Sequence, residues 1–387
     1  MNAQPLYDLA PTVRLAMMAL LLASGPLLLV YLRTRRTAPL ERVHALAVVT
    51  LFLTFDLVLF GAFTRLTDSG LGCPDWPGCY GSASPLGAWD AITAAQQAMP
   101  SGPVTQGKAW VEMVHRYLAM AVGVLIIVLT AVAWLGQRPP GKLLTSRTLW
   151  ATATLIWVCV QGLFGALTVT MKLFPAIVTL HLLGGYVLLA LLTVQVVQLQ
   201  RHRSGANGGI ALPGAVRSWI AAALAMLFVQ AASGAWVSTN YAVLACSDFP
   251  TCQASWWPAM NFQQALELWR PLGMTRGGDH ISFEALTAIH FLHRMLALLT
   301  LVFLGSLAAH LWGYSTLHRS TRWLAALLLL QVATGISNVV FEWPLLTAVI
   351  HTGGAGALVV VLVEMLATTY SQSASQRAMA FANRLTQ

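Results

Sequence analysis

Nine long apolar stretches limit what this chain can fold into more than any other feature. Each has about the 20 residues that a helix needs to cross a bilayer. They lie at 13–33, 45–65, 109–136, 148–170, 175–199, 218–239, 284–312, 322–340 and 345–369. Only 9% of the residues are charged, against about a quarter in soluble proteins. The sequence therefore predicts an all-α polytopic membrane protein and excludes a soluble globule or a disordered chain.

The basic residues predict how the chain is oriented. The net charge is +9, and most Lys and Arg residues lie in alternate loops and the tail, in the clusters 33–42, 138–147, 201–217, 319–322 and 377–384. Such loops face the cytoplasm, so we expect the N-terminus outside and the C-terminus in the cytoplasm. We interpret the charge as a topology signal and not as a nucleic-acid surface. No Arg- and Ser-rich presequence precedes the first span, which favours a bacterial plasma membrane.

An internal repeat divides the chain after the first span. Residues 61–73 align with residues 234–246, and residues 112–116 align with residues 290–294. The last eight spans therefore form two four-helix bundles, related by an axis along the membrane normal. The predicted organisation is an extra N-terminal transmembrane helix with its cytoplasmic loop (1–44), a first bundle (45–199), a cytoplasmic linker (200–217), a second bundle (218–369) and a cytoplasmic tail (370–387).

Each bundle carries one histidine on each of two spans, and the four are His115, His181, His293 and His351. At about 1.5 Å per residue, all four lie roughly 9–14 Å below the outer surface. Two imidazoles from different helices can bind the iron of a porphyrin from its two sides. The alternative is that they form hydrogen bonds between helices. Because the pattern is repeated at a common depth, we predict one haem site in each half.

Glu112 breaks the symmetry of the repeat. It lies one turn outward of His115 on the same helix face, where the second half has His290. A carboxylate in a region of low dielectric can transfer protons or stabilise developing positive charge, although it can also be a hydrogen-bond partner of a nearby His or Arg. We expect chemistry in the first half and an electron-carrying haem in the second. Arg116 and Arg294 are candidates to neutralise haem propionates.

Two cysteine pairs lie in the long outer loops. Cys73 and Cys79 are six residues apart in one loop, and Cys246 and Cys252 are six apart in the other. Close pairs on the oxidising face of a membrane readily form disulfides. We therefore expect one disulfide in each loop, with free thiols as the alternative.

A family resemblance is carried by three features together. These are the run Gly-Ala-Phe-Thr-Arg-Leu-Thr-Asp-Ser-Gly-Leu-Gly-Cys-Pro-Asp-Trp-Pro-Gly-Cys at 61–79, the motif Glu-Met-Val-His-Arg at 112–116, and the three other histidines. With them, residues 45–369 resemble the haem A synthase (CtaA/Cox15) family. The resemblance implies oxidation of the C8 methyl group of haem O to a formyl group by successive hydroxylations, which gives haem A for cytochrome oxidase.

The resemblance also implies roles for single residues. It places the substrate haem O near His115 and His181, a haem b cofactor on His293 and His351, and a catalytic function on Glu112. It matches the four loop cysteines to disulfides, and it implies haem O synthase and an electron donor as partners, of which the sequence does not identify the donor. The rival interpretation is a di-haem b-type membrane cytochrome, linked to quinol or ascorbate, that only transfers electrons and has no need for Glu112.

Overall fold

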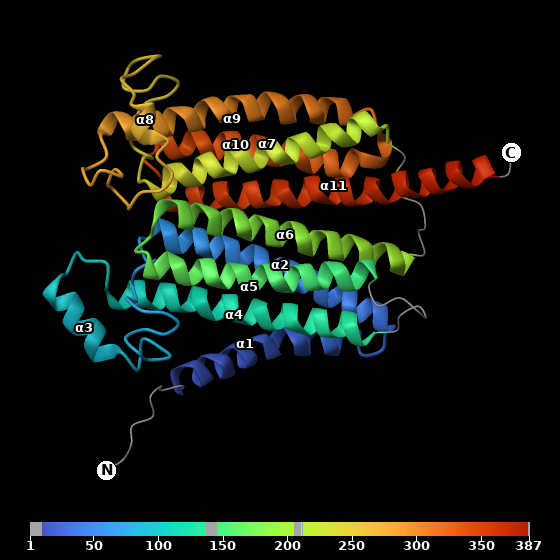
Figure 1. Ribbon diagram of the computed structural model, residues 1–387, viewed down its shortest axis with the longest axis horizontal. Helices are drawn as coiled ribbons and strands as arrows, with labels where there is room; N and C mark the ends of the chain where they lie inside the picture. Colours follow the sequence, from blue (N-terminus) through green and yellow to red (C-terminus); the bar gives the residue numbers. More distant parts are fainter. Residues whose placement is uncertain (1–9, 137–144, 205–209, 211, 386–387) are drawn as a thin grey trace, which may run out of the picture.

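The computed structural model describes residues 10–136, 145–204, 210 and 212–385, with side chains as far as residue 369. In these ranges nine helices are long and apolar enough to cross a membrane. They run side by side along one direction (Figure 1). The predicted all-α polytopic class is confirmed, and each predicted span lies inside one helix, with at most one residue beyond its end. Parts of the predicted N-terminal segment, linker and tail, at 1–9, 205–209, 211 and 386–387, lie outside the described residues.

Sequence signals at the outer ends explain where the histidine-bearing helices begin. The side chains of Thr105 and Ser282 accept hydrogen bonds from the third residue of the following helix, as N-cap residues do. Pro175 opens the third such helix, where its missing N–H costs no hydrogen bond. The long helices are α1 (Ala10–Thr34), α2 (Pro39–Leu66), α4 (Gln106–Leu135), α5 (Ser146–Thr170), α6 (Pro175–Ser204), α7 (Gly214–Thr239), α9 (Phe283–Leu311), α10 (His318–Val340) and α11 (Leu345–Leu385).

Eight of these helices form two closed rings. In the first ring α2 packs on α4, α4 on α5, α5 on α6, and α6 on α2, and α7, α9, α10 and α11 repeat the pattern. The helices α4 and α6 are therefore diagonally opposite in the first ring, as α9 and α11 are in the second. The two rings meet along a seam where α2 and α6 face α7 and α11. Helix α1 packs on α4 and α2 at the outer edge of the first ring (Figure 1).

Residues at equivalent positions of the repeat meet at this seam. Tyr186 of α6 is 1% exposed, and a methyl group added at Gly356 of α11 would lie 3.2 Å from its ring. The Tyr186 hydroxyl also donates to the carbonyl of Thr352, at 2.7 Å. Near the outer end of the seam, Arg65 donates to the carbonyl of its own equivalent, Ser238, at 2.5 Å. A pseudo-twofold axis therefore passes through the seam.

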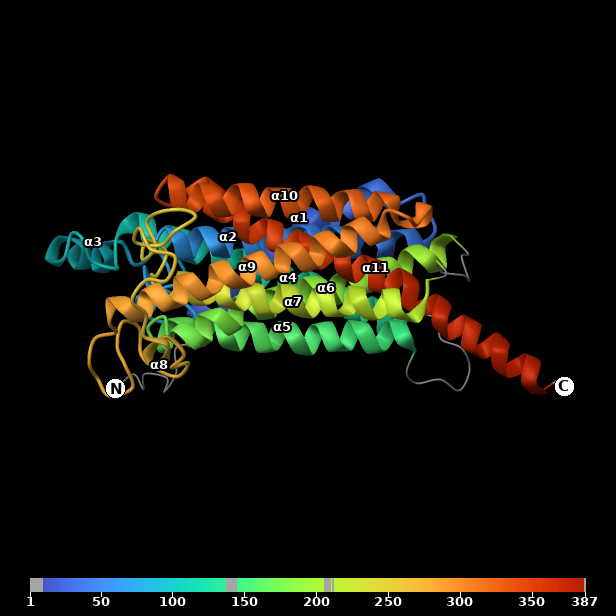
Figure 2. The same cartoon turned by 90° about the horizontal axis from the view of Figure 1, so that it is seen from above.

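The outer loops contain two further short helices, α3 (Trp89–Ala98) and α8 (Phe262–Ala265). Both lie at the same end of the molecule (Figures 1 and 2). The two predicted disulfides are confirmed, with Cα–Cα distances of 4.9 Å for Cys73–Cys79 and 4.6 Å for Cys246–Cys252. At the opposite end, α11 continues as helix to Leu385, beyond the span predicted to end at 369. That extension contains no glycine or proline to end the helix.

Candidate functional site

The four predicted histidines lie on the diagonally opposite helices of the two rings. His115 of α4 lies close enough to His181 of α6 for their charges to interact. The same holds for His293 of α9 and His351 of α11. Each lies about two to three turns inside the helix end next to the outer loops. The structure thus brings one pair of imidazoles together in each half, at corresponding positions of the repeat.

A glycine of the neighbouring helix lies against each histidine ring. A methyl group added at these glycines would come within 2.9 to 3.5 Å of a ring carbon, which is too close at Gly234, tight at Gly61 and ordinary contact at the other two. The pairs are Gly61 with His115, Gly165 with His181, Gly234 with His293 and Gly335 with His351. Each imidazole therefore lies against the backbone of the neighbouring helix, and the glycine there leaves room for the imidazole.

The free nitrogen of each ring is available for a ligand. In all four histidines Nε2 has no hydrogen-bond partner among the described residues. This nitrogen is also not fully buried, unlike the unpaired polar atoms in the interior of those residues. A neutral imidazole with a free Nε2 is the usual axial ligand of haem iron. Paired imidazoles on opposite helices, each with a free Nε2, fit a tetrapyrrole in each half.

The Glu112 side chain points to the first disulfide loop. It is 4% exposed, and its carboxylate accepts from the backbone amide of Cys73 at 2.8 Å and from the Arg116 guanidinium at 2.5 Å. Arg116 also donates to three carbonyls of the loop, those of Asp75, Pro77 and Gly78, at 2.5 to 3.2 Å. Glu112 and Arg116 together therefore fasten the loop over the outer end of α4.

His290 has the same role in the second half. Its Nδ1 accepts from the backbone amide of Cys246 at 3.3 Å, and its Nε2 lies 3.4 Å from Nε of Arg294. Arg294 donates to the carbonyls of Cys246, Asp248 and Thr251, each at 2.8 Å. Both arginines that were expected to face haem propionates thus hold loop carbonyls in this structure, and their contact with propionates stays a prediction.

An aspartate in each disulfide loop forms hydrogen bonds with the backbone of the same loop. Asp75 and Asp248 occupy equivalent positions, and each accepts two backbone amides from the residues after the second cysteine. Asp248 also accepts from the hydroxyl of Thr251. The Thr251 hydroxyl and the two amides hold the pKa of Asp248 below its ordinary value.

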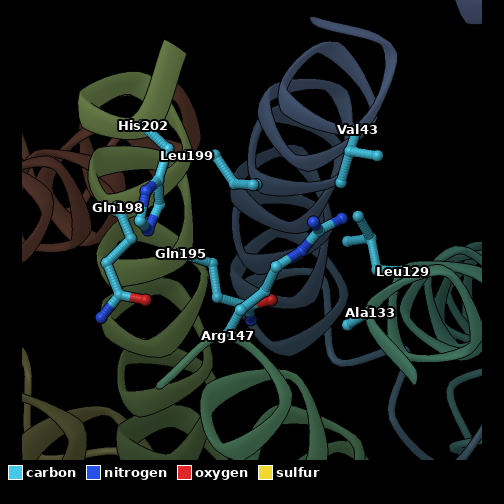
Figure 3. Close-up of a pocket in the computed structure, with 8 residues that line it drawn as sticks. All are labelled: Val43, Leu129, Ala133, Arg147, Gln195, Gln198, Leu199 and His202. Atoms are coloured by element: carbon cyan, nitrogen blue, oxygen red, sulfur yellow. The ribbon is translucent and has the colours of Figure 1, made fainter. Parts of the chain in front are cut away.

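A separate pocket lies at the other end of the first ring (Figure 3). Leu129 of α4 and His202 of α6 are among its lining residues, and Arg147 points into it. Along α4 and α6 these lining residues are roughly 20–30 Å from the histidines, at about 1.5 Å per residue. The pocket is therefore not part of the histidine site.

Comparison with known proteins gives a clear relationship. Residues 44–363 match the COX15-CtaA family model, which is described as a cytochrome oxidase assembly protein. This chain belongs to the COX15-CtaA family. The matched segment includes all four histidines and most of both rings, so the family covers the whole candidate site.

Several curated relatives within this family are named Heme A synthase. The protein from Shewanella oneidensis is 36% identical over 84% of this chain and 96% of its own length. The protein from Halalkalibacterium halodurans is 28% identical over 76% of this chain and 86% of its own length. The one from Hyphomonas neptunium is also 28% identical, over 78% of this chain and 85% of its own length.

Sequence reasoning missed some residues of the site. Gly61 and Gly234 begin the aligned repeat segments, but only the structure shows that they lie against histidine rings. Ser233 and Thr334, which contact Nδ1 of two histidines, carried no signal, because a lone hydroxyl in an apolar span usually bonds to its own helix backbone.

Proposed function

We propose that this member of the COX15-CtaA family is a haem A synthase. It oxidises the C8 methyl group of haem O to a formyl group by successive hydroxylations, and the product, haem A, goes to cytochrome oxidase. The observation that carries the proposal is the pair of histidines on diagonally opposite helices of each four-helix ring. A glycine of the neighbouring helix lies against each imidazole. The curated relatives named Heme A synthase supply the reaction.

The two halves have different tasks in this proposal. The first bundle (45–199) receives haem O between His115 and His181, and the second (218–369) holds haem b on His293 and His351. Bound haem b supplies one-electron transfer. Glu112, one turn outward of His115, provides the negative charge that stabilises a positive centre developing at the substrate methyl carbon. No equivalent carboxylate is present in the second half, where His290 stands.

The membrane setting follows from the span pattern and the basic loops. We place the protein in a bacterial plasma membrane, with its N-terminus outside and its C-terminus in the cytoplasm. The histidine sites then lie in the outer part of the bilayer. Haem O is supplied by haem O synthase, and the reaction also needs an oxidant for the methyl carbon, a source of the oxygen atom and an electron donor.

The direct test is pigment analysis of cells that make haem O, with and without this gene. Haems are extracted and separated by chromatography. We expect haem A only when the gene is present, with a matching decrease in haem O. If haem O is unchanged while the membranes gain a b-type spectrum, the proposal is wrong and the chain is an electron-transferring di-haem cytochrome.

A further inference from the structure

The two histidines of the second half each have a hydroxyl at Nδ1. Nδ1 of His293 lies 2.9 Å from Oγ of Ser233, and Nδ1 of His351 lies 2.8 Å from Oγ1 of Thr334. Ser233 is on α7 and Thr334 is on α10, so in both cases the hydroxyl comes from the helix that also supplies the glycine behind the ring.

Neighbouring backbone carbonyls indicate which way these hydrogen bonds run. Ser233 donates to the carbonyl of Gln230 at 2.8 Å, and Thr334 donates to the carbonyl of Leu330 at 2.7 Å. Each hydroxyl oxygen is then left to accept, so Nδ1 carries the ring proton and Nε2 keeps a free lone pair. The side-chain amide nitrogen of Gln230 lies 3.1 Å from Nδ1 of His293, and turning that amide by half a rotation puts its oxygen there as a second acceptor.

The first half has phenylalanine at both corresponding positions. Phe60 aligns with Ser233, and Phe164 aligns with Thr334. The Phe60 ring is stacked on His115, with 6.2 Å between centroids and 9° between planes. Nδ1 of His115 and Nδ1 of His181 are buried and have no hydrogen-bond partner among the described residues.

This difference bears directly on metal binding. A histidine that binds a metal almost always donates its other N–H to an acceptor, which fixes the tautomer and makes the ring a stronger ligand, and loss of such a partner weakens metal binding about 10- to 100-fold. The second half has these acceptors and the first half has apolar rings in their place. The histidines of the second half should therefore bind iron more strongly than those of the first half.

We propose that Ser233 and Thr334 are positioning residues that make the second site a permanent haem site, and that Phe60 and Phe164 keep the first site exchangeable. A cofactor has to stay bound, whereas a porphyrin substrate has to enter and its product has to leave. The assignment of the two sites to cofactor and substrate rests on the proposed function. The proposed difference in haem retention between the two sites rests only on the contacts of the imidazole rings.

The test measures haem retention in the purified full-length protein, loaded with ferric protoporphyrin IX. A His115→Ala background removes the first site, so only the second is read. We expect Ser233→Ala with Thr334→Val to speed haem transfer to apomyoglobin roughly 10-fold and to raise the haem midpoint potential, because the rings become weaker donors to ferric iron. The conservative pair Ser233→Thr and Thr334→Ser keeps an acceptor and should stay near the parent in both readouts.

Two results would overturn the proposal. One is an unchanged transfer rate and potential in the Ala/Val variant. The other is an equal change in the conservative variant, which would assign the effect to packing and not to the hydrogen bond.

The reciprocal exchange tests the first site. In a His293→Ala background, Phe60→Ser with Phe164→Thr should slow the transfer of ferric protoporphyrin IX, because both rings gain an acceptor. Transfer as fast as in the parent contradicts the proposal.

These measurements need neither haem O nor turnover, so they separate this inference from the proposed function. If the exchange rates change as expected while cells with the gene make no haem A, the proposed reaction is wrong and the retention mechanism stands. If haem A is made but the rates do not change, only the retention mechanism is wrong.

Discussion

The backbone amide of Cys73 donates a hydrogen bond to the carboxylate of Glu112, with 2.8 Å between N and Oε2. The second half makes the same connection with an imidazole, since the amide of Cys246 donates to Nδ1 of His290 at 3.3 Å. Fastening the disulfide loop therefore does not require a carboxylate. The carboxylate at position 112 therefore needs another explanation. The proposed chemistry on haem O in that half provides one.

Exchanging Glu112 for the residue that stands in its place in the second half tests this point. Glu112→His should keep the loop fastened, because a histidine at the equivalent position does so. We expect haem A formation to fall on the order of 100-fold, the usual effect of removing one charge-stabilising group. Haem A is measured by chromatography of extracted pigments, and retention of the Cys73–Cys79 disulfide serves as the folding control. Normal haem A formation in this variant would show that Glu112 is structural.

The second-half histidines are expected to set the low-spin haem spectrum. His293→Ala or His351→Ala removes one of two axial ligands, so the reduced-minus-oxidised spectrum should lose its low-spin b-type bands. His290→Ala, one turn outward on α9, is the matched control, because His290 contacts the loop and not the opposite histidine. A low-spin spectrum that survives either ligand variant would contradict the assignment.

The glycine beside His293, Gly234, should not tolerate a side chain. A methyl group at Gly234 would lie 2.9 Å from Cε1 of His293, so Gly234→Ala must displace the ring and should cost about 1–3 kcal/mol, as overpacking does. We expect lower haem content in the purified protein. Gly162→Ala and Gly123→Ala are controls, since no atom lies within 4 Å of a methyl group added at either. Equal haem content in all three variants would show that haem binding does not depend on the glycine beside His293.

The second disulfide loop should loosen in acid. Thr251 and two backbone amides lower the pKa of Asp248 from its ordinary value of 3.8. The depressed pKa means that Asp248 stabilises the folded loop above about pH 4, and that this contribution is lost as the pH falls through the lower folded value. Reduction of Cys246–Cys252 by a phosphine, followed by mass-tagging and expressed relative to an unstructured disulfide at the same pH, should therefore be faster at pH 3 than at pH 5. Asp248→Asn should remove that difference, and a variant with the parent's pH dependence would contradict the explanation.

Much of the fold followed from the sequence because it depends on length and hydropathy. A bilayer requires about 20 apolar residues per helix, and the repeat between 61–73 and 234–246 indicated two equivalent halves. The Cys73–Cys79 pairing was also predictable, because the cysteines are close in sequence. These features need no knowledge of which side chains meet.

The contacts between helices did not follow from the sequence. Helical periodicity places Arg116 about 100° around the helix from His115, but it does not show that the loop after Cys73 folds back to meet the guanidinium. The acceptors at Nδ1 were hidden for a similar reason, because Ser233 and Thr334 act across a helix pair whose rotation only the structure gives. The site roles of the histidines and of Glu112 stay predictions until the haem measurements are made.

The meeting of Tyr186 with Gly356 on the pseudo-twofold axis has a consequence for the two halves of the molecule. Two copies of the first half would bring tyrosine onto tyrosine at that point, and two copies of the second would leave a void between glycines. Two identical halves would therefore not fit together at this point. Each half is the complement of the other there, so that neither can replace its counterpart.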